Sequence, residues 1–201
     1  METIINENLL TPAVILISLT GLILLLSRDW RVGIGAFAVQ YIGVSIFVSI
    51  SWPIELAVIK LVAGWMGGAI LGTALAGEPT QWGETEPYIS SSSLFRLLAA
   101  FLVLPIITTI MPVLVEWLPN AQIQQVQGGF ILISMGLLHL GFKGNPVRVV
   151  IGLLTVIAGF EIYYATLEIS ALVAGLLAVI NIGLALVGAY LLLNPFMEET
   201  V

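Results

Sequence analysis

Two charged residues stand inside long apolar runs of the chain, where an ionised side chain is costly. Lys60 lies within the apolar run 54–76, and Glu161 lies within the run 146–166. Charged groups in the hydrocarbon region of a bilayer are expensive unless they are paired or hydrated, and they often mark routes for ions or protons. The chemistry that these two residue types permit is the carrying or gating of charge.

Lys60 is predicted to point into a helix bundle and not toward lipid. Gly64, Gly68 and Gly72 follow it at intervals of four residues, a stripe of small side chains that lets another helix approach closely. Glu55 is a poor partner, because five residues place it about 140° around the helix. The predicted partner is therefore a carboxylate from another helix. The alternative is that Lys60 extends toward an interface or forms a purely structural ion pair.

Glu161 and Glu168 are spaced so that both lie on one stripe of a continuous helix, with Tyr163 and Tyr164 close by. On such a helix Glu168 would lie about 10 Å further toward the outer surface. This stripe predicts a short proton path in which Glu161 binds and releases a proton. The alternative is that Glu161 is neutral or paired with a neighbouring subunit.

The composition excludes an ordinary soluble domain. Of the 201 residues, 59% are hydrophobic and only 9% are charged, whereas soluble domains carry about 25% charged residues. Seven apolar runs are long enough to cross a bilayer as helices. They cover residues 9–27, 32–51, 54–76, 94–118, 123–142, 146–166 and 169–193. The predicted fold is an all-α polytopic transmembrane bundle of about seven helices.

Five of the six basic residues fall at one side of this seven-helix plan. Arg28 and Arg31 follow the first run, Arg96 opens the fourth, and Lys143 and Arg148 flank the turn between the fifth and sixth. Lys and Arg collect in cytoplasmic loops of membrane proteins. We therefore expect a protein of a prokaryotic inner membrane, with its N-terminus outside and its C-terminus in the cytoplasm.

The chain also shows signs of an internal repeat. The pattern R-V-x-I-G opens a helix at Arg31 and again at Arg148, each time after a short basic turn. It predicts two parallel three-helix units related by an axis along the membrane normal. The expected units are residues 1–76 and 119–201, joined by the cytoplasmic loop 77–93 and the linking helix 94–118. The loop is either a docking segment for a neighbouring subunit or a solvated linker.

The remaining polar residues indicate no catalytic site. The chain has no cysteine and a single histidine, His139, so neither a thiolate nor a histidine cluster can bind a metal. Gln40 and Asn181 stand in the middle of apolar runs and are predicted to hydrogen-bond across helices. No basic stripe is present to neutralise phosphates, so nucleic acid is not an expected partner. We expect no cofactor and no catalytic chemistry in this chain alone.

The segment 128–193 resembles the NuoK-type subunits of respiratory complexes, and more closely hydrogenase-4 component E and the Mrp antiporter C subunit. The resemblance is carried by the basic turn KGNPVR and by the following VVIGLLTVIAGFEIYY, which contains Glu161. It implies that Glu161 is the buried carboxylate of a proton pathway and that Glu168 is the acid before the next helix. The chain departs from the pattern because residues 170–193 contain no acid; Asn181 is the strongly polar residue there.

Three functions follow as hypotheses. The first is a non-catalytic membrane subunit that helps other subunits, expected to be antiporter-like, to move H⁺ or Na⁺, at most as part of an oxidoreductase complex. In this role Lys60 or a partner chain would replace the missing second carboxylate. The second is a scaffold subunit without an ion relay, and the third is a small standalone transporter with its site between the two units.

Overall fold

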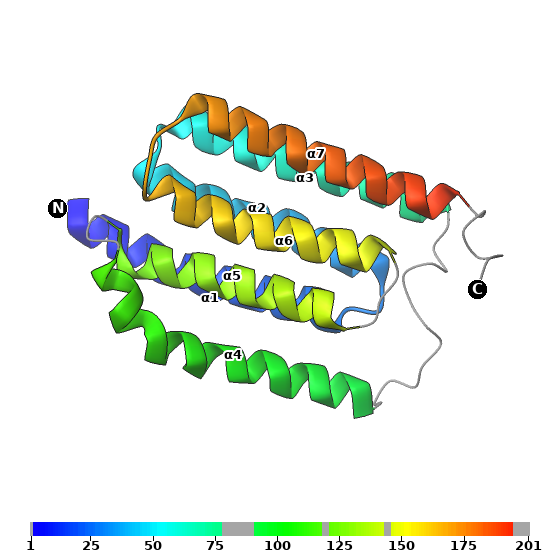
Figure 1. Ribbon diagram of the computed structural model, residues 1–201, viewed down its shortest axis with the longest axis horizontal. Helices are drawn as coiled ribbons and strands as arrows, with labels where there is room; N and C mark the ends of the chain where they lie inside the picture. Colours follow the sequence, from blue (N-terminus) through cyan, green and yellow to red (C-terminus); the bar gives the residue numbers. More distant parts are fainter. Residues whose placement is uncertain (1, 78–90, 118–120, 143–145, 195–201) are drawn as a thin grey trace.

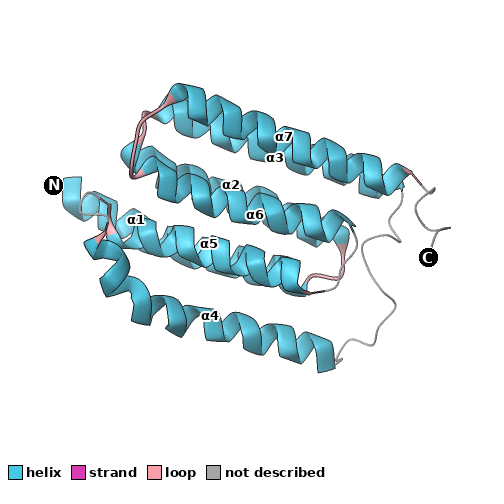
Figure 2. Ribbon diagram, in the orientation of Figure 1, coloured by secondary structure: helices cyan, strands magenta, loops and turns pink. Residues whose placement is uncertain are grey.

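The computed structural model describes residues 2–77, 91–117, 121–142 and 146–194, with the backbone alone for residues 2–9 and 91–92. Within these residues the chain forms seven helices and no strand (Figure 2). The helices are α1 (Glu2–Leu26), α2 (Trp30–Ser51), α3 (Ile54–Gly77), α4 (Ser91–Glu116), α5 (Ile123–Gly141), α6 (Pro146–Ala165) and α7 (Ala171–Leu193). The predicted all-α bundle is confirmed.

Six of the helices, α2 to α7, are long and apolar enough to cross a membrane. In α1 the apolar part is Leu10–Leu26, which spans about 25 Å as a helix and so approaches the thickness of the hydrocarbon core. Large apolar side chains are exposed on the outside of the bundle, among them Leu98 and Leu102 of α4 and Leu172 of α7. This distribution is that of an integral membrane protein, whose exterior faces lipid.

The helices form two layers of three, with α4 outside them (Figure 1). Helices α1, α2 and α3 make one layer, and α5, α6 and α7 make the other. Each helix packs against its counterpart across the interface: α1 on α5, α2 on α6 and α3 on α7, with each pair running in the same direction. Helix α4 packs against α5 and α1 at the edge of both layers.

This pairing bears on the predicted repeat. The two three-helix units do run parallel, and one helix separates them in the chain. However, a half turn about the membrane normal would place the first helix of one unit against the third helix of the other. The observed pairing of first with first and third with third corresponds instead to a shift from one layer to the next. The axis that we expected therefore does not describe the arrangement.

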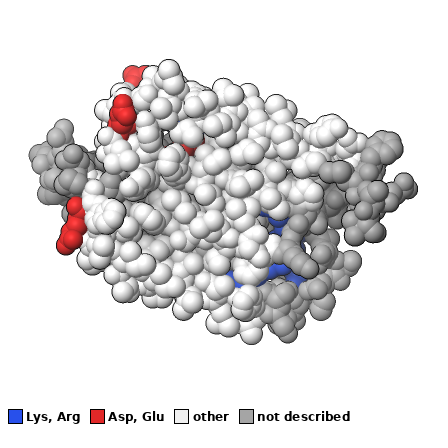
Figure 3. Space-filling model, in the orientation of Figure 1, with Lys and Arg blue, Asp and Glu red and all other residues white. Residues whose placement is uncertain are grey.

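Apart from the buried Lys60 and Glu161 and from Asp29, which caps α2, the described acidic and basic side chains lie toward opposite ends of the bundle (Figure 3). Arg28, Arg31, Arg96 and Arg148 lie near the ends of helices that meet on one side, which we call the basic end. Glu55, Glu116 and Glu168 lie at the opposite, acidic end. This agrees with the predicted helix count. Lys143 and nearly all of the loop 77–93 lie outside the described residues.

The glycine stripe of α3 packs against α2. A methyl group added at Gly64 would overlap with the ring of Tyr41, and at Gly68 or Gly72 it would contact Phe37 or Ile34. The predicted close approach of another helix is thus confirmed, and the helix is α2. Gly67, which is not part of the stripe, faces Ala185 of α7.

Helices α5 and α6 approach each other even more closely, backbone to backbone. A Cβ atom at Gly136 would lie 2.8 Å from the Val156 amide nitrogen, and one at Gly159 would lie 2.8 Å from the Ile133 amide nitrogen. Backbone atoms cannot turn aside as a flexible side chain can. The glycines on both helices are therefore what allows this pair to form the tightest contact of the second layer.

We expect Gly159→Ala to lower the free energy of unfolding by about 1–2 kcal/mol, because the added methyl group forces the α5 and α6 backbones apart. The measurement is equilibrium unfolding of the purified chain in mixed micelles, followed by circular dichroism. Gly175→Ala is the matched control, since a Cβ there meets no atom within 4 Å. Equal stability of the two variants would contradict the close contact.

Candidate functional site

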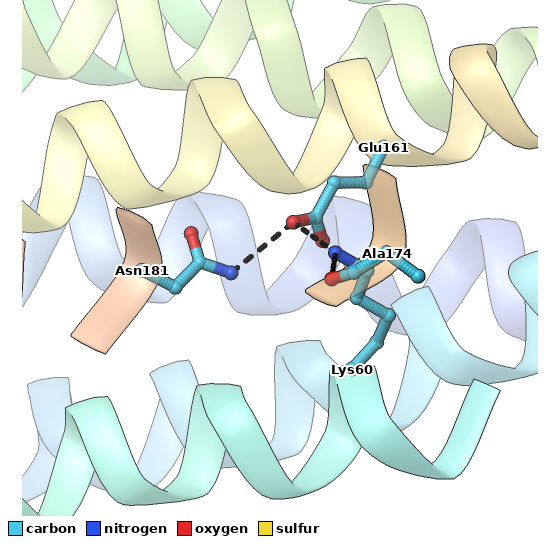
Figure 4. A network of polar contacts seen from close by, with 4 residues as sticks. All are labelled: Lys60, Glu161, Ala174 and Asn181. Carbon is cyan, nitrogen blue, oxygen red and sulfur yellow. Dashed lines mark hydrogen bonds and ion pairs between the residues drawn. The ribbon is translucent and has the colours of Figure 1, made fainter. Parts of the chain in front are cut away.

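Lys60 and Glu161 form an ion pair in the interior of the bundle (Figure 4). The distance from Lys60 Nζ to Glu161 Oε1 is 2.8 Å, and both side chains have 0% exposure. Lys60 comes from α3 and Glu161 from α6, so the pair crosses the interface between the two layers. The prediction that Lys60 points inward to a carboxylate of another helix is confirmed.

Helix α7 supplies two more contacts to this pair. The Lys60 ammonium also donates to the backbone carbonyl of Ala174 at 3.1 Å, and Asn181 Nδ2 donates to Glu161 Oε1 at 3.2 Å (Figure 4). The pair therefore joins three helices. Asn181 hydrogen-bonds across helices, as its position in an apolar run predicts.

Helix ends near the pair determine where these groups lie. Pro53 precedes α3, and its carbonyl accepts from the amides of Leu56 and Ala57, which starts the first turn. Ser170 caps α7, because its hydroxyl accepts from the Val173 amide. Lys60 is six residues into α3, or about 9 Å from its start. The ion pair thus lies in the half of the bundle toward the acidic end.

The charges of the pair cancel each other in an environment without solvent. An isolated ammonium or carboxylate buried in this way would lose its hydration with no compensation. Here each charge has the other at hydrogen-bond distance, and each also has one polar contact from α7. The arrangement can change its charge only if a proton or another ion reaches it.

Glu168 does not join the pair. Helix α6 ends at Ala165 and the chain then turns, so the continuous stripe that we expected is interrupted. Glu168 is exposed; its carboxylate accepts from the Tyr164 hydroxyl at 3.5 Å, and its carbonyl accepts from Trp52 Nε1 at 2.9 Å. The predicted path from Glu161 to Glu168 along one helical face is therefore not formed by the helix.

Three polar residues of the interior lie on the side of the pair that faces the basic end. Gln40 Nε2 donates to Thr155 Oγ1 at 3.4 Å, which links α2 to α6. Tyr41 is fully buried against Gly64, which follows Lys60 by one turn of α3 toward the basic end. Tyr41 was not predicted from the sequence. The available signal was its position in the middle of an apolar run, directly after Gln40.

The arginines form contacts at the basic end and not with the pair. Arg28 donates to Ser93, Arg148 donates to the carbonyl of Ser27, and the Arg96 guanidinium lies over the ring of Phe142. His139 is buried in the same region and lines a small pocket with Arg96 and Arg148. These residues connect helix ends at the basic end of the bundle.

The described residues contain no cluster of His, Cys, Asp and Glu that could bind a metal ion. The candidate site is therefore the Lys60–Glu161 pair with Asn181 and the neighbouring Tyr41. The resemblance to NuoK-type subunits stays a prediction carried by the residues of segment 128–193. Comparison of the chain with protein-family profiles, with curated proteins and with solved structures found no match.

Proposed function

We propose that the chain is a non-catalytic membrane subunit that assists the movement of H⁺ or Na⁺ across the bilayer. In this role Glu161 accepts and releases the moving charge, and Lys60 controls its affinity for that charge. The observation that carries the proposal is the fully buried ion pair between α3 and α6. The partners would be other membrane subunits of the antiporter-like kind, as the resemblance to NuoK-type subunits implies.

The energetics of buried ion pairs favour a functional role for Lys60 and Glu161 over a purely stabilising one. Replacing a buried ion pair by apolar side chains of similar size is often neutral or stabilising, so packing alone does not require such a pair. Ionisable residues inside membrane-spanning helices commonly serve in ion or proton routes. Two charges and an amide between α3, α6 and α7 are therefore better explained by a role in an ion or proton route than by stabilisation of the packed interior.

The pair could also compensate for the absence of an acidic residue in residues 170–193. In the proposal, Lys60 of the first unit provides the second charged group that the NuoK pattern places in its third helix. Asn181, on that helix here, contacts Glu161 without bringing a charge. A relay of this kind would use charges from both three-helix units.

We expect Glu161→Gln to reduce ion pumping at least fivefold, because an amide cannot bind and release a proton at this site. The measurement is proton uptake by inverted membrane vesicles from the source cells, with the variant replacing the native gene. Glu55→Gln is the matched control, since Glu55 is an exposed acid at the start of α3. Assembly is followed by the amount of the chain that co-purifies with its partners.

A structural scaffold is the second candidate function. It is favoured by the direct contacts that the pair makes between helices. The Lys60 ammonium is held by Glu161 and by the Ala174 carbonyl, so the pair can act as a fixed cross-link between the layers. Normal pumping by the Glu161→Gln complex, together with normal assembly, would exclude the relay. Reduced assembly with normal pumping per assembled complex would favour the scaffold.

A further inference from the structure

Four buried oxygen atoms near the ion pair have no hydrogen-bond partner within the described part of the chain. They are Gln40 Oε1, Tyr41 Oη, Glu161 Oε2 and Asn181 Oδ1. Their side chains are at most 1% exposed. Buried polar atoms in folded proteins are nearly always paired, and an ordered water molecule is the usual partner where protein groups are lacking.

The side chains that carry these atoms lie along the bundle axis, from the ion pair toward the basic end. Thr155, the partner of Gln40, lies six residues before Glu161 on α6, or about 9 Å toward the basic end. Asn181 lies seven residues after Ala174 on α7, again about 10 Å toward the basic end. Tyr41 follows Gln40 on α2, and its ring lies against Gly64, one turn beyond Lys60 on α3. The polar atoms thus extend from the pair between the layers.

We propose that these atoms hold a chain of water molecules that leads from Glu161 toward the basic side of the bundle as far as Gln40, and that Tyr41 passes the proton along it. This inference rests on the proposed function and specifies the route of the ion. A hydroxyl can donate and accept at the same time. The Tyr41 hydroxyl passes its hydrogen to a water molecule beside Glu161, and that water passes one of its own hydrogens to Glu161 Oε2. At the same time the Tyr41 oxygen takes a proton from the water on its other side, which regains a proton from the basic side. Tyr41 ends unchanged, and Glu161 gains one proton.

The same geometry identifies the moving ion as H⁺ and not Na⁺. The Lys60 ammonium already occupies the cation position of Glu161, at 2.8 Å from Oε1 and 3.1 Å from the Ala174 carbonyl. A sodium ion at Oε2 would place a second cation on a carboxylate that carries a single negative charge. A proton instead forms a covalent O–H bond and needs no coordination shell of oxygen atoms.

The first test asks whether water reaches Tyr41. Hydroxyl radicals generated by X-rays in water label side chains next to bound water, even when these have no exposed surface. We expect labelling of Tyr41 in the purified full chain in detergent, but not of Phe47, which is equally buried on the same helix. Labelling of neither residue, or of both equally, would overturn the proposed water chain. This measurement does not depend on any transport function.

The second test asks whether the Tyr41 hydroxyl carries the proton. Tyr41→Phe removes only that hydroxyl and keeps the ring against Gly64, so we expect unchanged thermal stability and at least fivefold slower proton uptake in the vesicles. Tyr190→Phe, at an exposed tyrosine of α7, is the control. If Glu161→Gln abolishes uptake and Tyr41→Phe leaves it unchanged, the relay through Tyr41 is wrong and the proposed function stands. If Glu161→Gln has no effect, the proposed function itself fails.

Discussion

Lys60→Met is expected to lower the free energy of unfolding by about 3–5 kcal/mol, the range found when one member of a buried ion pair is removed. The reason is that Glu161 would keep its burial and lose its ammonium partner, with Asn181 as its remaining donor among the described residues. Glu161→Met should cost a similar amount, because within the described part of the chain the ammonium would keep the Ala174 carbonyl and lose its charged partner. Equilibrium unfolding in mixed micelles measures both.

The double variant Lys60→Met/Glu161→Met distinguishes the pair from two independent charges. It removes both charges at once, so we expect a stability within about 1 kcal/mol of the native chain, or higher. Two independent sites would instead show the sum of the single effects. Arg31→Met is the control, because Arg31 is an exposed cation at the basic end and should change stability by less than about 0.5 kcal/mol.

A stable double variant would favour a functional role for the two charges. If the bundle folds as well without the pair as with it, the two charges are not there to hold the helices together. Loss of proton uptake in the same variant would then be assigned to the charges and not to misfolding. Stability and transport measured on one set of variants therefore separate the relay from the scaffold.

The helices themselves could be predicted from the sequence almost to the residue. The run 54–76 corresponds to Ile54–Gly77, and the run 146–166 corresponds to Pro146–Ala165. The physical reason is that a lipid-facing helix is apolar on all sides, so the length of the apolar run defines the helix. The largest difference is at α1, which starts at Glu2 and not at residue 9, because the helix continues beyond the apolar residues.

The pairing of the helices could not be predicted for the same reason. A helix that is apolar all round has no single hydrophobic face that identifies its neighbour, so the packing of α2 against both α3 and α6 is not apparent from the sequence. Lys60 could be assigned a carboxylate partner, but not Glu161 in particular. Tyr41 was missed because its importance arises only where α2 meets the glycine stripe of α3. No helix-breaking residue precedes the end of α6 at Ala165. The sequence therefore did not indicate that the helix ends before Glu168.

The glycine stripe of α3 supplies the second large effect. We expect Gly64→Ala to lower the free energy of unfolding by about 3 kcal/mol, at the upper end of the range for overpacked cores. The added methyl group would overlap with the fully buried Tyr41 ring, which is itself in edge contact with Phe37 at a centroid distance of 5.0 Å. The ring cannot turn away without displacing a second aromatic side chain.

The other two members of the stripe are matched controls on the same helix. A Cβ at Gly68 would lie 3.4 Å from Phe37 and one at Gly72 would lie 3.5 Å from Ile34, which are ordinary contact distances. Gly68→Ala and Gly72→Ala should therefore be neutral, or stabilising by about 0.5–1 kcal/mol through the higher helix propensity of alanine. Equal losses at all three positions would contradict the close packing of Tyr41 on Gly64.

A compensating variant relates this packing to the proposed proton route. Tyr41→Ala removes the ring, so Gly64→Ala/Tyr41→Ala should lose much less stability than the sum of the two single changes. Gly64→Ala alone should also slow proton uptake, because a displaced ring moves the Tyr41 hydroxyl relative to Glu161. Gly68→Ala leaves that hydroxyl in place and should leave uptake unchanged. A loss of uptake in Gly64→Ala at a temperature where the variant is still folded would show that the position of the hydroxyl, and not the stability of the bundle, limits the transfer.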